Sequence, residues 1–345
     1  MILPVEQPIH VDIIIPVYNE EDAVFGLHHQ LKQAIDPLTA YQFNIYYVDD
    51  GSTDNTQSVL TRLAGDDDRV TVLELSRNFG HQAALTAGLD QSTGDYVVTM
   101  DGDGQHPPSL LPEMLNLAQS GYDIVVAQRV VDQPHNFKNL TSSWFYHLIN
   151  LIGDTSIQPG AADFRLLRRS VVESLISMRE YHRLLRGMVA WMGYRSVVLP
   201  YLQPERLGGK SKYSLSKMLR LAVHAIFSFS LGPLYLGISL GVIFLVLALV
   251  EVVYVLSFWV TGNQASLAPG WSSLMFVLLC VGGSLMAMLG FVGIYVGFIF
   301  QEIKQRPIYL IRSQTSGKQT IRDNPMEAGK REQPPDPPAD NKVSG

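Results

Sequence analysis

Two aspartates separated by one glycine, Asp101 and Asp103, are the side chains in this sequence that point most directly to chemistry. They follow an apolar run at 96–100 that is typical of a buried strand. Two carboxylates in that position can reach one divalent cation, because Mg2+ and Mn2+ prefer oxygen ligands and bridge protein carboxylates to substrate phosphates. Since Asp and Gly are also common in surface turns, the pair alone is weak evidence for a metal site. The neighbouring sequence motifs must therefore be considered with it.

The neighbouring sequence contains three more polar clusters, each just after a predicted strand. Their sequences are PVYNEE at 16–21, VDDGSTD at 48–54 and RNFG at 77–80. In a parallel sheet the carboxyl ends of the strands share one edge, and ligands bind beyond that edge. We therefore expect the clusters to surround one site, in which a bound cation would neutralise a diphosphate and make it a better leaving group.

The elements that must position these clusters alternate in type along the chain. The predicted strands are residues 11–17, 43–48, 70–75 and 96–100, and the predicted helices are residues 23–34, 54–64 and 82–89. Short apolar strands separated by helices indicate an α/β fold with a mainly parallel sheet.

The composition indicates that part of the chain lies in lipid. Only 17% of the 345 residues are charged, whereas soluble domains average about 25%. Residues 231–250 and 274–300 contain no charged residue, and roughly 20 apolar residues suffice to cross a bilayer as a helix. We predict a C-terminal anchor of two transmembrane helices over 231–300. Buried core helices are the alternative, but these are usually shorter and show a polar face.

Basic residues flank the two runs, and the linker at 261–273 has none. The positive-inside rule therefore predicts a cytoplasmic catalytic domain at 1–213 and a cytoplasmic tail at 301–345, with the linker outside. The tail is poor in apolar residues, so we expect it to be largely disordered. Residues 144–152 and 214–230 are expected to be helices. The second is expected at the membrane interface, and the first is either interfacial or an ordinary helix of the domain.

Several classes of protein and feature are excluded or disfavoured by simple counts. The net charge of −6 argues against a nucleic-acid-binding protein. A single cysteine, Cys280, excludes an intrachain disulfide and fits a reduced compartment. The first ten residues lack the pattern of a cleaved signal peptide. Transmembrane helices of this kind often associate, which would give a homo-oligomer.

Taken together, PVYNEE, VDDGSTD, RNFGHQAALTAG and MDGDGQHPP, in this order and spacing, resemble the family 2 glycosyltransferases with the GT-A fold. Two later segments, AADFRL at 161–166 and RLGGKSKY at 206–213, resemble the polyprenyl-phosphate branch of that family. That branch includes bactoprenol glucosyltransferases and dolichyl-phosphate mannose synthases. The resemblance spans roughly 11–312.

The resemblance implies a role for each matching residue. A metal, Mg2+ or Mn2+, would be held by Asp101 and Asp103. Asp163 is the family's catalytic base, although a phosphate monoester is mostly dianionic at pH 7 and hardly needs one. The catalytic set would be Asp103, Asp163, Arg206 and Lys212. The donor nucleotide would be bound by Pro16, Tyr18, Glu20, Asp49, Asp50, Asp101 and Gln105. The acceptor phosphate would be bound by Arg129, Lys138, Arg206, Ser211 and Lys212. Lys138 stands where the family often has a second arginine, which weakens that assignment.

The implied reaction is inverting transfer of one sugar from a nucleotide sugar to a polyprenyl phosphate, such as undecaprenyl phosphate, at the cytoplasmic membrane face. The variant GAADFRLL at 160–167 favours UDP-glucose as donor. GDP-mannose, GlcNAc and modified aminosugar donors remain alternatives. A processive polysaccharide synthase is a rival, but RLLRGMVAW at 183–191 does not match its Q-x-x-R-W motif and two helices cannot enclose a polymer channel. A non-catalytic membrane scaffold is a rival from another class, and the intact acidic motif argues against it.

Overall fold

The computed structural model describes residues 8–130, 161–181, 183–204, 270–317 and 319–321, together with short stretches between 239 and 261. Its centre is a nine-stranded sheet with the order β7-β5-β6-β4-β1-β2-β3-β8-β9. The strands are β1 (Ile9–Val17), β2 (Tyr41–Asp49), β3 (Val70–Leu75), β4 (Tyr96–Thr99), β5 (Ile124–Arg129), β6 (Ala161–Arg168), β7 (Ser196–Tyr201), β8 (Ile311–Ser316) and β9 (Gln319–Ile321).

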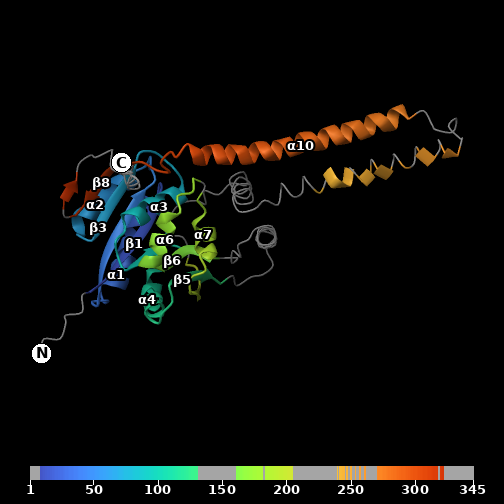
Figure 1. Ribbon diagram of the computed structural model, residues 1–345. Coiled ribbons are helices and arrows are strands. Elements are labelled where there is room, and N and C mark those ends of the chain that lie inside the picture. Colours follow the sequence, from blue (N-terminus) through green and yellow to red (C-terminus); the bar gives the residue numbers. More distant parts are fainter. Residues whose placement is uncertain are drawn as a thin grey trace, which may run out of the picture.

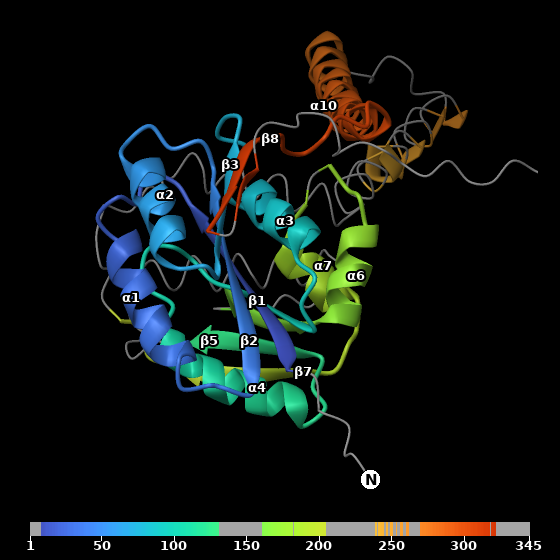
Figure 2. The same ribbon diagram turned by 90° about the vertical axis from the view of Figure 1, so that its left-hand side faces the viewer.

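Helices cover both faces of this sheet (Figures 1 and 2). They are α1 (Val24–Ile35), α2 (Thr56–Asp66), α3 (His81–Gln91), the short η1 (Pro108–Leu110), α4 (Leu111–Gln119), α6 (Arg169–Ser177), α7 (Leu185–Trp191) and α10 (Trp271–Ile303). Because side chains alternate along a strand, Ile13 and Ile15 of β1 pack on the α1, α2 and α4 side, whereas Ile14 packs on the α3, α6 and α7 side.

The expected α/β fold is confirmed, and the sheet is mixed rather than mainly parallel. β1 pairs in parallel with β2 and β4, and β2 with β3, as the alternating pattern predicts. β6 runs antiparallel between β4 and β5, and β8 runs antiparallel beside β3. The strand β8 comes from the segment that we expected to belong to a largely disordered tail. That expectation was wrong for 311–316, because Arg312 and Ser313 bond to Glu74 of β3 at 2.8 and 2.7 Å.

Helix α10 extends away from the sheet (Figure 1). It has 33 residues, contains the predicted apolar run at 274–300, and is the one helix among the described residues that is long and apolar enough to cross a membrane. The other predicted run, 231–250, lies mostly outside the described residues, as do the segments 144–152 and 214–230. The residues described between 239 and 260 are helical, and they lead away from the sheet while α10 leads back (Figure 1).

Candidate active site

The predicted polar clusters meet at the carboxyl edge of the parallel strands, as expected. The loop after β1 is joined to the loop after β2, since Ser52 Oγ accepts from the Asn19 backbone N–H at 2.9 Å and Asn19 Oδ1 accepts from Thr53 N–H at 2.8 Å. The loop after β4 packs against β1 as well. A Cβ on Gly102 would lie 2.6 Å from Val17 Cγ1 and 3.1 Å from Pro16 O, so only glycine fits there without a shift.

Asp49 and Asp50, predicted to bind the nucleoside, are buried and hold loops. Asp49 Oδ1 accepts from the backbone N–H and the hydroxyl of Ser52 at 2.9 and 2.5 Å. Asp50 accepts from the N–H groups of Phe79 and Gly80 at 2.7 and 2.9 Å. Burial raises the pKa of both carboxyls, and these hydrogen bonds oppose the rise. Their contact with a nucleoside stays a prediction.

His106 contacts both the backbone and the carboxylate of Asp101. The Asp101 backbone N–H donates to His106 Nδ1 at 2.8 Å. That bond leaves the ring proton on Nε2, which lies 3.6 Å from Asp101 Oδ2. The His106 ring stacks on Phe164 with centroids 5.2 Å apart. Packing and the backbone bond therefore fix the His106 ring against the loop that carries Asp101.

A divalent cation fits the Asp101–Asp103 pair. Asp101 Oδ1 is buried without a hydrogen-bond donor among the described residues, and such a lone pair suits a metal ion. Asp103 turns the loop by accepting from the Gln105 N–H at 3.0 Å. Within the described part of the chain no group of three or more acidic, histidine or cysteine side chains is placed to hold a metal. Proteins usually bind Mg2+ through one or two carboxylates, and substrate phosphates and water supply the other ligands.

Asp163 lies beside this pair, and the sheet register accounts for its position. Thr99 of β4 pairs with Arg165 of β6 in antiparallel register, and continuing that register by two residues brings Asp101 opposite Asp163. The His81 ring, at the start of α3, lies between the two: its Nε2 is 3.3 Å from Asp163 Oδ2 and 3.5 Å from Asp101 Oδ1. Burial would lower the pKa of His81, but the hydrogen bond to Asp163 and both carboxylate charges outweigh it and raise that pKa.

Arg186 is the residue that the sequence reasoning missed. Its Nε and Nη2 donate to the two oxygens of Asp163 at 2.8 and 2.7 Å. We had set aside 183–191 because it fails the Q-x-x-R-W motif. The burial of its neighbours Leu185 and Gly187 in α7 is known only from the structure, so no signal in the sequence identified Arg186. Arg168, on the same strand as Asp163, instead pairs with Asp123 at 3.4 Å.

Some of the remaining predicted residues lie in the described part of the chain, and the others lie outside it. Pro16 is buried in β1, and Tyr18, Glu20 and Gln105 are half-buried at the same sheet edge. Arg129 is exposed at the end of β5, opposite Tyr201 of β7. The predicted acceptor residues Lys138, Arg206, Ser211 and Lys212 lie outside the described residues.

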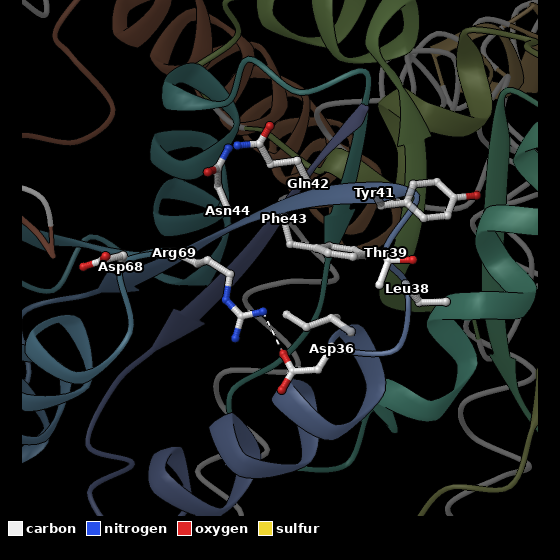
Figure 3. A pocket seen from close by; sticks show the side chains of 10 residues that line it. Asp36, Leu38, Thr39, Tyr41, Gln42, Phe43, Asn44, Asp68 and Arg69 are labelled. Carbon is white, nitrogen blue, oxygen red and sulfur yellow. Dashed lines mark hydrogen bonds and ion pairs between the residues drawn. The ribbon is translucent and has the colours of Figure 1, made fainter. Parts of the chain in front are cut away.

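A cavity of about 400 Å³ lies at the other edge of the sheet (Figure 3). It is lined by the start of β2 and the end of α1. Arg69, which lines it, donates through Nε and Nη2 to the two oxygens of Asp67 at 2.9 and 2.8 Å and through Nη1 to Asp36 at 2.8 Å. This cavity contains none of the predicted site residues.

Comparison with known proteins gives matches along almost the whole chain. The profile of the family "Glycosyl transferase family 2" matches residues 12–176. The uncharacterized glycosyltransferase YkcC of Bacillus subtilis (strain 168) is 35% identical over 92% of this chain and 98% of its own. The bactoprenol glucosyl transferase of Shigella phage SfX is 35% identical over 88% and 99%. Among solved structures, a mannosyltransferase from Pyrobaculum calidifontis in complex with GDP-Man and Mn2+ is 20% identical over 87% of both chains, with a TM-score of 0.46.

Proposed function

The chain belongs to glycosyl transferase family 2, and from that premise we propose that it transfers one sugar, with inversion, from a nucleotide sugar to a polyprenyl phosphate. The observation that carries the proposal is the juxtaposition of the Asp101–Asp103 pair with the arginine-held Asp163 at one sheet edge. The near full-length similarity to proteins named bactoprenol glucosyl transferase supports the acceptor and favours UDP-glucose as the donor. GDP-mannose and nucleotide donors of GlcNAc or a modified aminosugar are the alternatives.

Each side of the site has a proposed task. Asp101 and Asp103 would hold Mg2+ or Mn2+, which when bound neutralises the donor diphosphate and stabilises it as a leaving group. Tyr18, Glu20 and the loops supported by Asp49 and Asp50 would enclose the nucleoside. Arg129, Lys138, Arg206, Ser211 and Lys212 would attract the acceptor phosphate, because two anions must approach each other and their repulsion opposes the reaction.

The proposed location is the cytoplasmic face of a membrane, with a two-helix anchor over 231–300, an interfacial helix at 214–230 and both termini inside. A parity argument supports the anchor. Residues before 204 and the strand β8 belong to one sheet, so they lie on the same side of any membrane. If α10 crosses the bilayer, the chain between 204 and 271 must cross it an odd number of times. The helical residues described between 239 and 260 are suited to that crossing.

The proposal is tested by incubating the purified protein with undecaprenyl phosphate, Mn2+ or Mg2+, and a panel of nucleotide sugars. We expect a lipid-linked sugar from one donor, and the double variant D101N/D103N should lower its rate by about 100-fold or more, since metal stabilisation of the leaving group is worth several kcal/mol. D66N/D68N is the matched control, because it removes two exposed carboxylates at the same spacing. Formation of no lipid-linked sugar from any donor would refute the proposal.

A further inference from the structure

We propose that Arg186 is a positioning residue of the transfer reaction: it holds Asp163 as a fixed carboxylate at the acceptor side, so that Asp163 orients the acceptor and does not take a proton from it. The inference rests on the proposed function for the identity of the acceptor. It concerns a residue that no motif singled out, on a helix that contributes none of the predicted site residues.

The contact between the two side chains has the geometry of a strong ion pair. Arg186 donates from Nε to Asp163 Oδ1 at 2.8 Å and from Nη2 to Oδ2 at 2.7 Å. Two parallel bonds of this kind fix both the position and the rotation of a carboxylate. The Asp163 side chain is 6% exposed and that of Arg186 33% exposed. One partner is therefore buried, and the other reaches the surface of the site.

The surroundings of Asp163 leave little capacity for accepting a proton. His81 from α3 approaches Oδ2 at 3.3 Å, and Arg165 from β6 lies 3.9 Å from Oδ1. Burial alone would raise the pKa of Asp163, but the paired guanidinium of Arg186 is the main charge that offsets it, and the pKa of that carboxyl lies well below its usual range. A phosphate monoester is already mostly dianionic at pH 7, so the reaction does not require a base there.

The charge balance favours the same role. Asp163 carries one negative charge, and two arginines, Arg165 and Arg186, lie within 4 Å of it. Both guanidinium groups therefore oppose the negative charge of Asp163 on the side where we place the anionic acceptor. A carboxylate left alone in that place would repel the phosphate.

Arg186 is itself held against the helix that begins at the site. The Leu185 N–H, one residue before Arg186, donates to Gln82 Oε1 of α3 at 3.0 Å. Arg183 bonds Thr86 Oγ1 of α3 at 3.3 Å and the Leu175 carbonyl at 2.8 Å. The start of α7 is thus fixed to α3, and α3 carries His81 at its first position. This chain of contacts sets where the Arg186 guanidinium can lie.

The test compares R186Q and R186K with a matched control, R69Q. Arg69 makes the same two bonds to Asp67, with side chains 30% and 6% exposed, at the opposite edge of the sheet. We expect R186Q to lower kcat for lipid transfer by roughly 100-fold with an unchanged donor KM, and R186K to recover part of that loss because lysine keeps the charge but not the fork. R69Q should lower the melting temperature as R186Q does and leave kcat unchanged.

The pH profile separates positioning from a purely structural contribution. In R186Q the burial of Asp163 acts without its main counter-charge, so kcat should fall on acidification at a pH where the wild type is flat. A wild-type kcat and pH profile in R186Q would overturn the inference. A raised donor KM with an unchanged kcat would overturn it too, since it would place Arg186 on the donor side.

One measurement is independent of the proposed acceptor. Infrared difference spectra on acidification should show in R186Q, beside the bands of the other carboxyl groups, an additional protonated-carboxyl band that is missing from the wild type and from R186Q/D163N. The absence of that band in R186Q would refute the claim that Arg186 keeps Asp163 ionised. This result can be obtained even if the wild type transfers no sugar to any lipid, so failure of the proposed function and failure of this inference can be told apart.

Discussion

Replacing Asp50 by asparagine should loosen the loop at 77–80 and destabilise the catalytic domain. Asp50 is 4% exposed and accepts the backbone N–H groups of Phe79 and Gly80 at 2.7 and 2.9 Å. Hydrogen bonds to a charged group contribute about 1.5–3 kcal/mol each. Asparagine keeps one acceptor and turns an NH2 group toward the other donor, so close to one such bond is lost and one buried N–H is left unpaired.

The burial of the charge reduces this figure. Burial raises the pKa of Asp50 despite its two hydrogen bonds, so removing the charge returns part of the desolvation energy. We therefore expect a loss of about 2–3 kcal/mol, which for a domain of this size lowers the melting temperature by roughly 4–12 °C.

The assay is thermal unfolding of the purified protein, followed by circular dichroism. The control is D54N, because Asp54 lies in the same acidic cluster and accepts a single N–H, from Thr56, at 3.0 Å. That variant should change the melting temperature by only about 1–3 °C. If D50N and D54N melt together, the two hydrogen bonds of Asp50 do not hold the loop and the reasoning is refuted.

Two more predictions follow from the packing. G102A should cut activity by about 10- to 100-fold with normal folding, because the new Cβ would lie 2.6 Å from Val17 Cγ1 and displace the metal-binding loop; G65A, whose Cβ meets open space, should match the wild type. Burial lowers the pKa of His28, although the negative charge of the neighbouring Asp67 opposes this shift. Neutral His28 therefore stabilises the fold fully above pH 6.5 and less as the pH falls further. H28Q should flatten the fall in melting temperature between pH 7 and 5, and H29Q, at an exposed position, should leave it unchanged.

The sequence predicts the elements that local periodicity determines. The expected strand at 70–75 is β3, and those at 11–17, 43–48 and 96–100 differ from β1, β2 and β4 by one or two residues at their ends. Each of these strands buries apolar side chains against the helices that cover the sheet, and this burial produces the apolar runs seen in the sequence. The convergence of the polar clusters was predictable for the same reason, since parallel strands place their carboxyl ends together.

Long-range contacts account for what the sequence did not predict. The segment IRSQTS at 311–316 has almost no apolar alternation, and it becomes β8 because β3 offers an unpaired edge and Glu74 offers a partner for Arg312. The pairing of Arg186 with Asp163 depends on how α7 lies against α3, and neither residue's neighbours in the chain indicate it.

The position of β8 also bears on how the protein is made. β3 is synthesised early, but its partner strand follows the apolar helix α10 and emerges from the ribosome far later. The sheet therefore has an open edge until the chain beyond α10 has been made, and a bare edge strand is prone to pair with other chains. Closing that edge is a late event, so under the proposed topology completion of the catalytic domain is tied to insertion of the segment that precedes β8. A chain that stalls before β8 would lack the strand that pairs with the β3 edge of its sheet.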